Sequence, residues 1–280
     1  MNSFSRLKKD VIVFLRKNQI QPSKKLGQNF LIDKKIISTI IKNAQLDKKD
    51  IILEIGPGTG ILTKELVSRA KLVIAVEKDQ KISEALKKNF GGLKNLKILQ
   101  GDILKIKNLN LKNYHFKIVA NLPYYITMPV IRKFLEKKPK PKLMILMVQK
   151  EVAQRICAKP PKMNLLAVSV QFFAKPEIIS YVSKNAFWPS PKVDSAIIKI
   201  EPKIEETYSL KFKNLFFKII KAGFSQPRKI LINNLCRNFD KNKEKLIEIF
   251  QRNNINPFSR AENLNLEEWL KITKNLFFYL

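Results

Sequence analysis

Five short, nearly continuous apolar runs in the first 150 residues constrain the fold of the chain more than any other feature. They are Ile51–Ile55, Leu72–Val76, Leu96–Leu99, Phe116–Ala120 and Leu143–Val148. Amphipathic stretches with helical periodicity, such as Ile61–Arg69 and Lys81–Phe90, separate them. Strands that are apolar throughout are buried on both faces, and their alternation with helices is typical of a doubly wound parallel sheet. The sequence therefore predicts an α/β fold.

Further elements are predicted on either side of this pattern. Asp33 is suited to cap a helix that extends to Gln45. Two β-rich segments, Ile178–Val182 and Ala196–Ile200, flank a proline-rich loop and are expected to complete the sheet at one edge. Beyond Pro202, apolar residues recur every three or four positions, which predicts helices. The predicted helices are Lys211–Ala222, Arg228–Arg237, Lys243–Arg252 and Leu266–Lys274.

The length and charge of the chain indicate two domains and a polyanionic partner. A chain of 280 residues can form one large α/β core and a smaller accessory domain. We expect a sheet domain at residues 1–202 and a helical domain at residues 203–280. The formal net charge is +31, and self-repulsion of this size favours a partner such as RNA. The alternative is that AT-biased coding enriches lysine and that the charges are merely solvated.

Several classes of function are excluded by what the sequence lacks. Two cysteines, Cys157 and Cys236, and one histidine, His115, are too few for a zinc or iron site. We expect both cysteines to be buried as small apolar residues. The apolar run Val11–Leu15 is shorter than a signal-peptide core, and no run approaches the ~18 residues that span a bilayer. We therefore expect no metal site and a cytoplasmic protein.

A glycine-rich turn and two acids follow the first three predicted strands. Gly56-Pro57-Gly58-Thr59-Gly60 precedes a helix, and glycines there let the backbone approach a ligand. Glu77 follows the second strand, where an acid can accept hydrogen bonds from ribose hydroxyls. Asp102, after the third strand, can accept from the exocyclic amine of adenine. The structural alternatives are an ordinary tight turn for the glycines and a loop or helix-cap role for Asp102. Together these residues predict a nucleoside site.

The fourth predicted strand leads into Asn121-Leu122-Pro123-Tyr124-Tyr125. An amide, a proline-constrained turn and an aromatic ring suit an unpaired or flipped-out base. The Asn121 side chain and the Leu122 backbone carbonyl can both accept from an adenine N6 amine, and Tyr124 can stack on the ring. An Asx-Pro turn with buried tyrosines is the structural alternative.

These motifs resemble, in residue type and order, the ribosomal RNA adenine N6-dimethyltransferase family. The resemblance begins with Asn-Leu-Pro-Tyr after a strand, with Leu53–Gly60 and with Glu77. It covers about residues 22 to 275 and includes five further segments. They are Lys24–Leu31, Gln149–Ile156, Phe187–Ser195, Phe224–Lys229 and Arg260–Leu264. One departure is Lys159–Leu166, which lacks the family's usual glycine and tyrosine and changes the expected local turn.

The resemblance implies a seven-stranded Rossmann-like methyltransferase sheet, a small helical C-terminal domain and S-adenosyl-L-methionine as cofactor. With the motifs, it predicts a catalytic site in which an aromatic, Phe187, packs on the target base opposite the tyrosine. This site comprises Asn121, Leu122, Pro123, Tyr124 and Phe187. The predicted cofactor site comprises Gln28, Asn29, Leu31, Gly56, Gly58, Glu77, Asp102 and Asn121.

Within the family, Leu122 and the Lys24–Leu31 segment favour the enzymes that act on 16S ribosomal RNA. These dimethylate two adjacent adenosines in a hairpin loop near its 3′ end, whereas their macrolide-resistance relatives modify large-subunit RNA. The expected partner is 16S rRNA in an immature small subunit, with a monomeric enzyme and neither a protein partner nor a membrane. A non-catalytic RNA-binding assembly factor and a DNA adenine methylase remain the alternatives.

Overall fold

The computed structural model describes residues 3–106, 109, 111, 115–203, 208–239 and 242–277. By its contacts, the chain divides into two compact units. The first comprises residues 1–153 and 176–202, and the second comprises residues 154–175 and 203–280. The domains predicted from the sequence place residues 154–175 with the sheet, whereas their contacts group them with the C-terminal helices.

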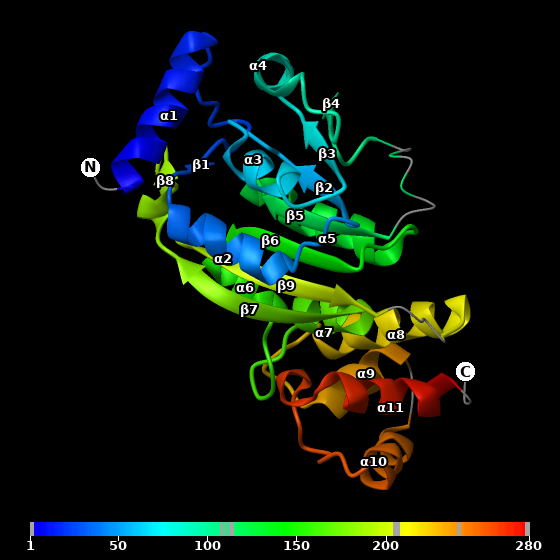
Figure 1. Cartoon of the computed structure of the whole chain (residues 1–280). Coiled ribbons are helices and arrows are strands. Elements are labelled where there is room, and N and C mark those ends of the chain that lie inside the picture. Colours follow the sequence, from blue (N-terminus) through cyan, green and yellow to red (C-terminus); the bar gives the residue numbers. More distant parts are fainter. Residues whose placement is uncertain are drawn as a thin grey trace. The chain divides into compact units, whose positions relative to one another are not determined.

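The first unit is built on a seven-stranded sheet with the order β4-β3-β2-β5-β6-β9-β7 (Figure 1). Its strands are β2 (Ile51–Ile55), β3 (Leu72–Glu77), β4 (Leu96–Gln100), β5 (Phe116–Asn121), β6 (Leu143–Gln149), β7 (Ala174–Val182) and β9 (Ser195–Pro202). The strands β2 to β6 pair in parallel, and β9 pairs antiparallel with β6. The predicted α/β fold with a seven-stranded sheet is confirmed.

Burial along the strands follows their position in the sheet. Every residue of the central strand β2 is buried, because helices cover both faces of the sheet there. The strand β4 was predicted as a buried run, but it forms an edge of the sheet and three of its five residues are exposed. Its Lys97 and Leu99 are among these exposed residues.

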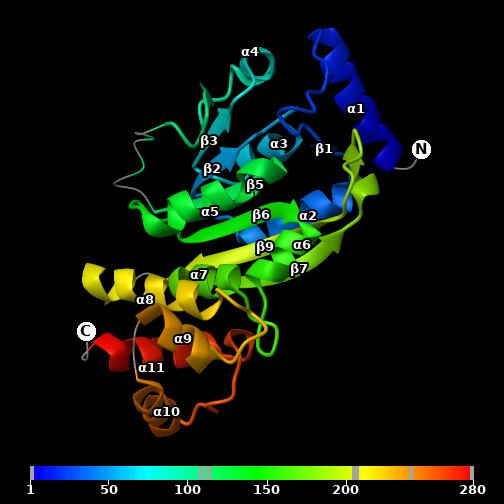
Figure 2. The ribbon, with the colours of Figure 1, turned by 180° about the vertical axis from the view of Figure 1, so that it is seen from behind.

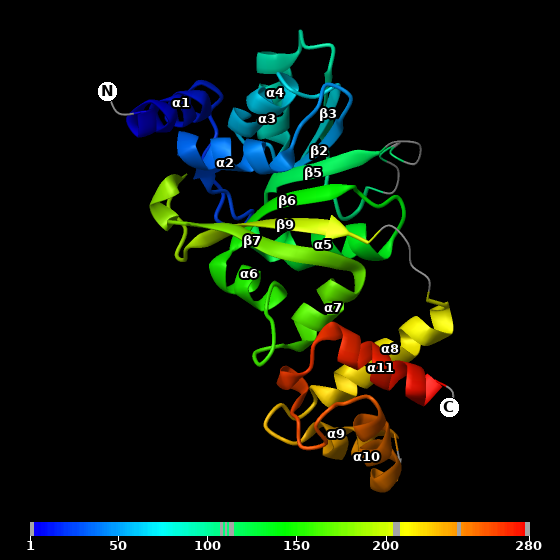
Figure 3. The ribbon, with the colours of Figure 1, turned by 60° about the horizontal axis from the view of Figure 1, so that its bottom comes forward.

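Helices cover the two faces of this sheet (Figures 2 and 3). One face packs against α2 (Lys34–Ala44) and α3 (Ile61–Val67), whose Ile40 and Leu66 join the same apolar cluster as sheet residues. As predicted, Asp33 caps α2, accepting from the backbone N–H groups of residues 35 and 36. The opposite face packs against α5 (Thr127–Glu136).

Two parts of the first unit had no counterpart in the sequence prediction. The helix α1 (Ser3–Lys17) buries Val11 and Leu15 in a cluster that also contains residues of α4 (Gln80–Phe90). In addition, β1 (Phe30–Leu31) pairs antiparallel with β8 (Phe187–Trp188). This short pairing sets Leu31 opposite Phe187.

The second unit consists of helices packed around aromatic side chains. They are α7 (Leu165–Phe173), α8 (Leu210–Gly223), α9 (Leu231–Phe239), α10 (Lys243–Arg252) and α11 (Leu266–Phe277), and a short helix, α6 (Lys150–Ile156), leads into this unit. The Phe172 and Phe216 rings stack with centroids 4.4 Å apart, and the Trp269 side chain is fully buried. The four helices predicted beyond Pro202 are confirmed.

The two cysteines and the search for membrane-spanning helices complete the comparison with the sequence. Both Cys157 and Cys236 were expected to be buried, but they are partly exposed. Within the described parts of the chain, no helix is both long enough and apolar enough to cross a membrane.

Candidate active site

The carboxyl-terminal ends of β2, β3, β4 and β5 border one cavity, whose empty volume with its open mouth is about 1100 Å³. It lies where the strand order reverses between β2 and β5, the usual ligand position in open α/β sheets. All twelve residues predicted for the two sites line this cavity. They are Gln28, Asn29, Leu31, Gly56, Gly58, Glu77, Asp102, Asn121, Leu122, Pro123, Tyr124 and Phe187.

The turn between β2 and α3 depends on its glycines. Gly56, Gly58 and Gly60 have φ values of +70°, +57° and +83°, which L side chains rarely adopt. A Cβ atom on Gly58 would lie 3.0 Å from the Phe30 ring, and one on Gly60 would lie 2.6 Å from the Phe90 ring. The backbone therefore forms the cavity wall without side chains at Gly56 and Gly58, while Gly60 allows close packing of the turn against the Phe90 ring.

Glu77 is held at the end of β3 with only 7% of its surface exposed. Its carboxylate accepts from the backbone N–H groups of Gly58, at 3.2 Å, and Asp79, at 2.9 Å. Burial raises the pKa of Glu77, and these hydrogen bonds act in the opposite direction. The Gln28 side chain donates to Asp79 at 3.0 Å, which links the segment before β1 to the same loop.

Asp102 follows β4 and lies at the same cavity. Its Oδ1 atom accepts from the Leu104 N–H at 2.9 Å, and its Oδ2 atom lies 3.1 Å from the Lys78 ammonium. Burial acts to raise the pKa of Asp102, but the Leu104 hydrogen bond and the Lys78 charge outweigh it, so the pKa is lowered. The site thus holds an ionised acceptor.

The Asn-Leu-Pro-Tyr turn is held at both ends by hydrogen bonds. The Asn121 Nδ2 atom donates to the Asn29 backbone oxygen at 3.1 Å, which leaves Oδ1 as the accepting end of the amide. The Tyr124 hydroxyl lies 2.7 Å from Ser195 Oγ on β9. Burial raises the pKa of Tyr124. Phe187 also lines the cavity, although its side chain is only 3% exposed.

Sequence reasoning assigned no role to Glu54, which is 1% exposed and lies one residue before the carboxyl end of β2. Its Oε2 atom has no hydrogen-bond partner. Burial raises the pKa of Glu54 to about 8, the Thr63 hydroxyl opposes this shift, and the Glu77 charge adds to it. The sequence signal that could have identified Glu54 was an acidic residue within an otherwise apolar strand. Lys78 and Tyr125 also line the cavity but were given no role in the sequence prediction. Lys78 lies outside the motifs, and Tyr125 is the last residue of the Asn121–Tyr125 segment, in which only Tyr124 was assigned to the base.

The residues present fit a positively charged nucleoside. Among the described residues, the ionisable groups that line the cavity are three acids, Glu54, Glu77 and Asp102, and one base, Lys78. The buried and unpartnered Glu54 oxygen favours a ligand that brings a hydrogen-bond donor or a positive charge. Both features suit S-adenosylmethionine, which combines an adenosine with a sulfonium and an ammonium group. Among the residues that the structure describes, no three His, Cys, Asp or Glu side chains are grouped as a metal site requires.

A mainly parallel sheet with a glycine turn, a buried acid at the next strand end and an Asn-Leu-Pro-Tyr turn is typical of a Rossmann-like, nucleoside-dependent transferase. The family model described as ribosomal RNA adenine dimethylase matches residues 20–276. The ribosomal RNA small subunit methyltransferase A of Dehalococcoides mccartyi, strain BAV1, is 43% identical over 258 residues, which cover 90% of this chain and 88% of that protein.

Two solved structures share the fold over most of their length. A dimethyladenosine transferase from Plasmodium falciparum superposes with a TM-score of 0.76 at 28% identity, covering 89% of this chain and 97% of that one. The 23S rRNA methyltransferase ErmE gives a TM-score of 0.76 at 25% identity and covers 89% of this chain and all of that one.

The chain belongs to the ribosomal RNA adenine dimethylase family. Membership of this family confirms the predicted enzyme class, an S-adenosylmethionine-dependent rRNA adenine dimethyltransferase. The modified position in the RNA and the role of each cavity residue remain predictions.

Proposed function

We propose that the protein dimethylates the N6 amines of two adjacent adenosines in the 3′-terminal hairpin loop of 16S rRNA. The observation that carries this proposal is the convergence of all twelve predicted residues on one cavity at the strand-order reversal. The small-subunit name of the Dehalococcoides mccartyi relative supports 16S rRNA as the substrate. The proposed setting is small-subunit biogenesis in the cytoplasm, with a monomeric enzyme acting on an immature subunit.

Asn121 is proposed to hold the reacting amine. Its Oδ1 atom and the Leu122 backbone carbonyl would accept from the two N6 hydrogens, which draws the amine toward tetrahedral geometry and frees its lone pair. S-adenosylmethionine, when bound, supplies the methyl group on a positively charged sulfur. The enzyme's own residues would contribute positioning and electrostatics, and no general base is required because the amine proton can leave to water after the methyl group has been transferred. The hydrogen bond from Asn121 to Asn29 supports this role because it orients the amide before substrate binds.

Tyr124 and Phe187 are proposed to hold the target base between them. The Tyr124 ring is restrained at its hydroxyl end by Ser195, so less side-chain entropy is lost when a base stacks on it. Pro123 fixes the turn between Asn121 and this ring with φ at −55°. Stacking of one base on an aromatic side chain is worth ~1–3 kcal/mol.

The remaining residues are proposed to bind the cofactor. Glu77 would accept from the ribose hydroxyls, and Asp102 from the 6-amino group of the cofactor's adenine. Gly56 and Gly58 would allow close approach of the backbone. The other proposed contacts come from the segment that precedes and forms β1, namely Gln28, Asn29 and Leu31.

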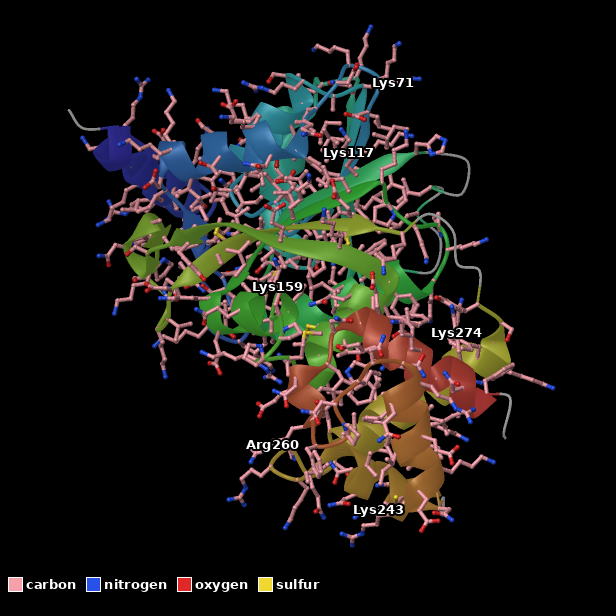
Figure 4. All side chains as sticks on the ribbon, turned by 90° about the horizontal axis from the view of Figure 1, so that it is seen from below. Lys71, Lys117, Lys159, Lys243, Arg260 and Lys274 are labelled. Carbon is pink, nitrogen blue, oxygen red and sulfur yellow. The ribbon has the colours of Figure 1, made fainter. Side chains whose placement is uncertain are left out.

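RNA binding is proposed to depend partly on the helical unit. Side chains ending in nitrogen project from the ribbons of both units, and Lys243, Arg260 and Lys274 are labelled examples in the helical unit (Figure 4). Exposed basic residues also lie on and after α8. They are Lys211, Lys218, Lys221, Arg228, Lys229 and Arg237. Such residues bind phosphates without reading sequence, and they make affinity strongly salt-dependent.

The test is methyl transfer from labelled S-adenosylmethionine to small subunits that lack the modification, followed by mapping of the methylated adenines. We expect two adjacent dimethylated adenosines in the 3′-terminal loop. Modification of large-subunit RNA or of DNA would contradict the proposed substrate. Cofactor binding without methyl transfer to any of these substrates would support the non-catalytic alternative.

An Asn121→Ala variant tests the role of the proposed catalytic amide. Loss of one preorganised polar contact at a reacting centre costs ~10²–10³ in rate. We therefore expect single-turnover methyl transfer to fall by about this factor, with a much smaller change in cofactor affinity. A near wild-type rate with a lowered melting temperature would instead establish Asn121 as a turn residue only.

A further inference from the structure

Lys133 directs its side chain at the loop that carries Asp102. It lies on α5, and its Nζ atom is 2.5 Å from the Ile103 oxygen, 2.8 Å from the Ile106 oxygen and 3.5 Å from the Leu104 oxygen. An ammonium group has three donors and no acceptor, so these three backbone carbonyls can use its full hydrogen-bonding capacity.

The loop itself is a single hydrogen-bonded turn. The Leu104 N–H donates to the Asp102 side chain, while the N–H groups of Lys105 and Ile106 donate to the Asp102 backbone oxygen at 2.9 and 3.0 Å. Like the end of a helix, such a turn presents carbonyls that have no partner within it. Lys133 supplies that partner, as a basic side chain does at a helix C-terminus.

The position of Lys133 has an electrostatic cost that a merely solvated lysine would not have. Burial lowers its pKa, the neighbouring Lys137 acts in the same direction, and Asp102 opposes both. No carboxylate in the described parts of the chain forms an ion pair with Lys133, so the three carbonyl dipoles are what offset the burial of its charge. Lysine is seldom withdrawn from water without such compensation.

The second cation at Asp102 cannot perform the same task. Lys78 contacts the Asp102 carboxylate with 47% of its own side chain exposed, and among the described residues it makes no hydrogen bond to the loop backbone. It can therefore balance charge, but it does not restrain the position of the turn. Among the hydrogen bonds of the described residues, those of Lys133 tie this loop to α5, which is packed on the sheet.

We propose that Lys133 is a positioning residue that makes the enzyme selective for the 6-amino group of the cofactor's adenine, by fixing Asp102. This inference rests on the proposed contact between Asp102 and that amine. A carboxylate discriminates a donor from an acceptor only if it is held within hydrogen-bond distance of it. Without the ammonium, the turn can shift to bring its carbonyls to water, and Asp102 moves with it.

The experiment compares two ligands of the full-length protein by calorimetry, S-adenosylhomocysteine and S-inosylhomocysteine. The second carries a carbonyl oxygen in place of the 6-amino group, so it presents an acceptor to the Asp102 carboxylate. A hydrogen bond to a charged group is worth roughly ten- to hundredfold in affinity, so wild type should prefer the adenosyl ligand by about this factor. The Asp102→Asn variant should lose most of this preference, because an amide can also donate to the carbonyl.

In Lys133→Met we expect the preference to fall to within about threefold, mainly through weaker binding of the adenosyl ligand. Lys133→Arg keeps the charge and the donors and should retain most of the selectivity. If Lys133→Met does not fold, Lys133→Gln provides a neutral side chain that keeps one donor group, with an intermediate preference expected.

Lys117→Met is the matched control. Lys117, labelled in Figure 4, also inserts an ammonium among backbone carbonyls of the first unit, those of Ala44 and Gln45 at the end of α2, and it pairs with Asp50. Its removal should lower the melting temperature without changing the ligand preference, because it does not contact the Asp102 loop.

The outcomes separate this inference from the proposed function. Wild-type selectivity that survives in Lys133→Met but is lost in Asp102→Asn overturns the role of Lys133 alone. A wild-type protein without selectivity overturns the Asp102 contact and this inference with it, whereas the rRNA substrate is tested independently by mapping the methylated adenines. An equal loss of selectivity in Lys117→Met would show general destabilisation and would also overturn the inference.

Discussion

Replacing Glu54 by glutamine should remove a specific pH dependence from the stability of the cofactor-free protein. Burial raises the pKa of Glu54 to about 8 from an ordinary value of 4.5. Between these two pH values the folded protein holds one proton more than the unfolded chain at this site. Stability from this group is therefore fully present below about pH 4.5, and it is lost as the pH rises toward about 8.

The expected magnitude follows from the linkage between protonation and folding. One proton of difference changes the free energy of unfolding by about 1.4 kcal/mol per pH unit, so two units from about pH 5.5 to 7.5 amount to about 3 kcal/mol. In a unit of this size, 1 kcal/mol shifts the melting temperature by about 2–4 °C. Over this interval, the wild-type melting temperature should fall relative to that of Glu54→Gln by roughly 6–12 °C.

The assay is thermal unfolding by circular dichroism at several pH values without cofactor. The informative quantity is the difference in melting temperature between Glu54→Gln and wild type, and how this difference changes with pH. The absolute melting temperature of the variant is less informative, because a buried amide can leave a donor unpaired at a cost of ~1–3 kcal/mol. Glu84→Gln removes the same charge from an exposed position on α4 and should follow the wild-type profile. Parallel profiles for Glu54→Gln and wild type would refute the reasoning.

Three further outcomes are expected from the same structure. The affinity for S-adenosylmethionine should rise between about pH 6 and 8 in wild type and less in Glu54→Gln, measured by calorimetry, because a cationic ligand favours the ionised carboxylate. Tyr125→Leu should raise the KM for small-subunit RNA by about tenfold through lost base stacking. Tyr125 is 51% exposed and lines the cavity, whereas the equally accessible control Tyr181, 54% exposed, does not, and Tyr181→Leu should leave this KM nearly unchanged. Neutralising Lys211 and Lys218 together should reduce the log–log salt slope of RNA binding by about 1.4, if each contacts one single-stranded phosphate. An unchanged slope in filter-binding titrations would remove them from the interface.

The sheet could be predicted because its strands are apolar nearly throughout, which is the strongest local signal that a buried strand can leave in a sequence. The predicted strands ended where the apolar runs ended, but the real strands β3 to β6 each continue by one residue. These extra residues are Glu77, Gln100, Asn121 and Gln149. Strand pairing is a property of the backbone, so a polar side chain does not end it. Two of the four are proposed site residues, since they occupy the strand ends that face the cavity.

Interactions between distant segments could not be predicted from local patterns. The two-residue strands β1 and β8 are far apart in sequence, and only their pairing places Leu31 opposite Phe187. The Tyr124–Ser195 and Asn121–Asn29 hydrogen bonds likewise join segments that the sequence gives no local reason to connect. The position of the two short strands and of these bonds is a consequence of the folded sheet, so it becomes visible only in the structure.

The charges of the protein have opposite signs on its surface and in its cavity, and these serve different ligands. A net charge of +31 attracts RNA, but it also opposes the approach of a cationic cofactor. Salt screens exposed charges beyond ~8 Å at physiological ionic strength, whereas buried carboxylates are screened much less. Glu77 and Glu54 therefore dominate the potential inside the cavity when they are ionised.

Because its pKa is about 8, Glu54 is mostly protonated in the free protein near neutral pH and avoids the cost of an unpaired buried charge. At this pH a positive group beside Glu54 favours its ionisation, so this acid can supply more negative charge when the cofactor is bound than when it is absent.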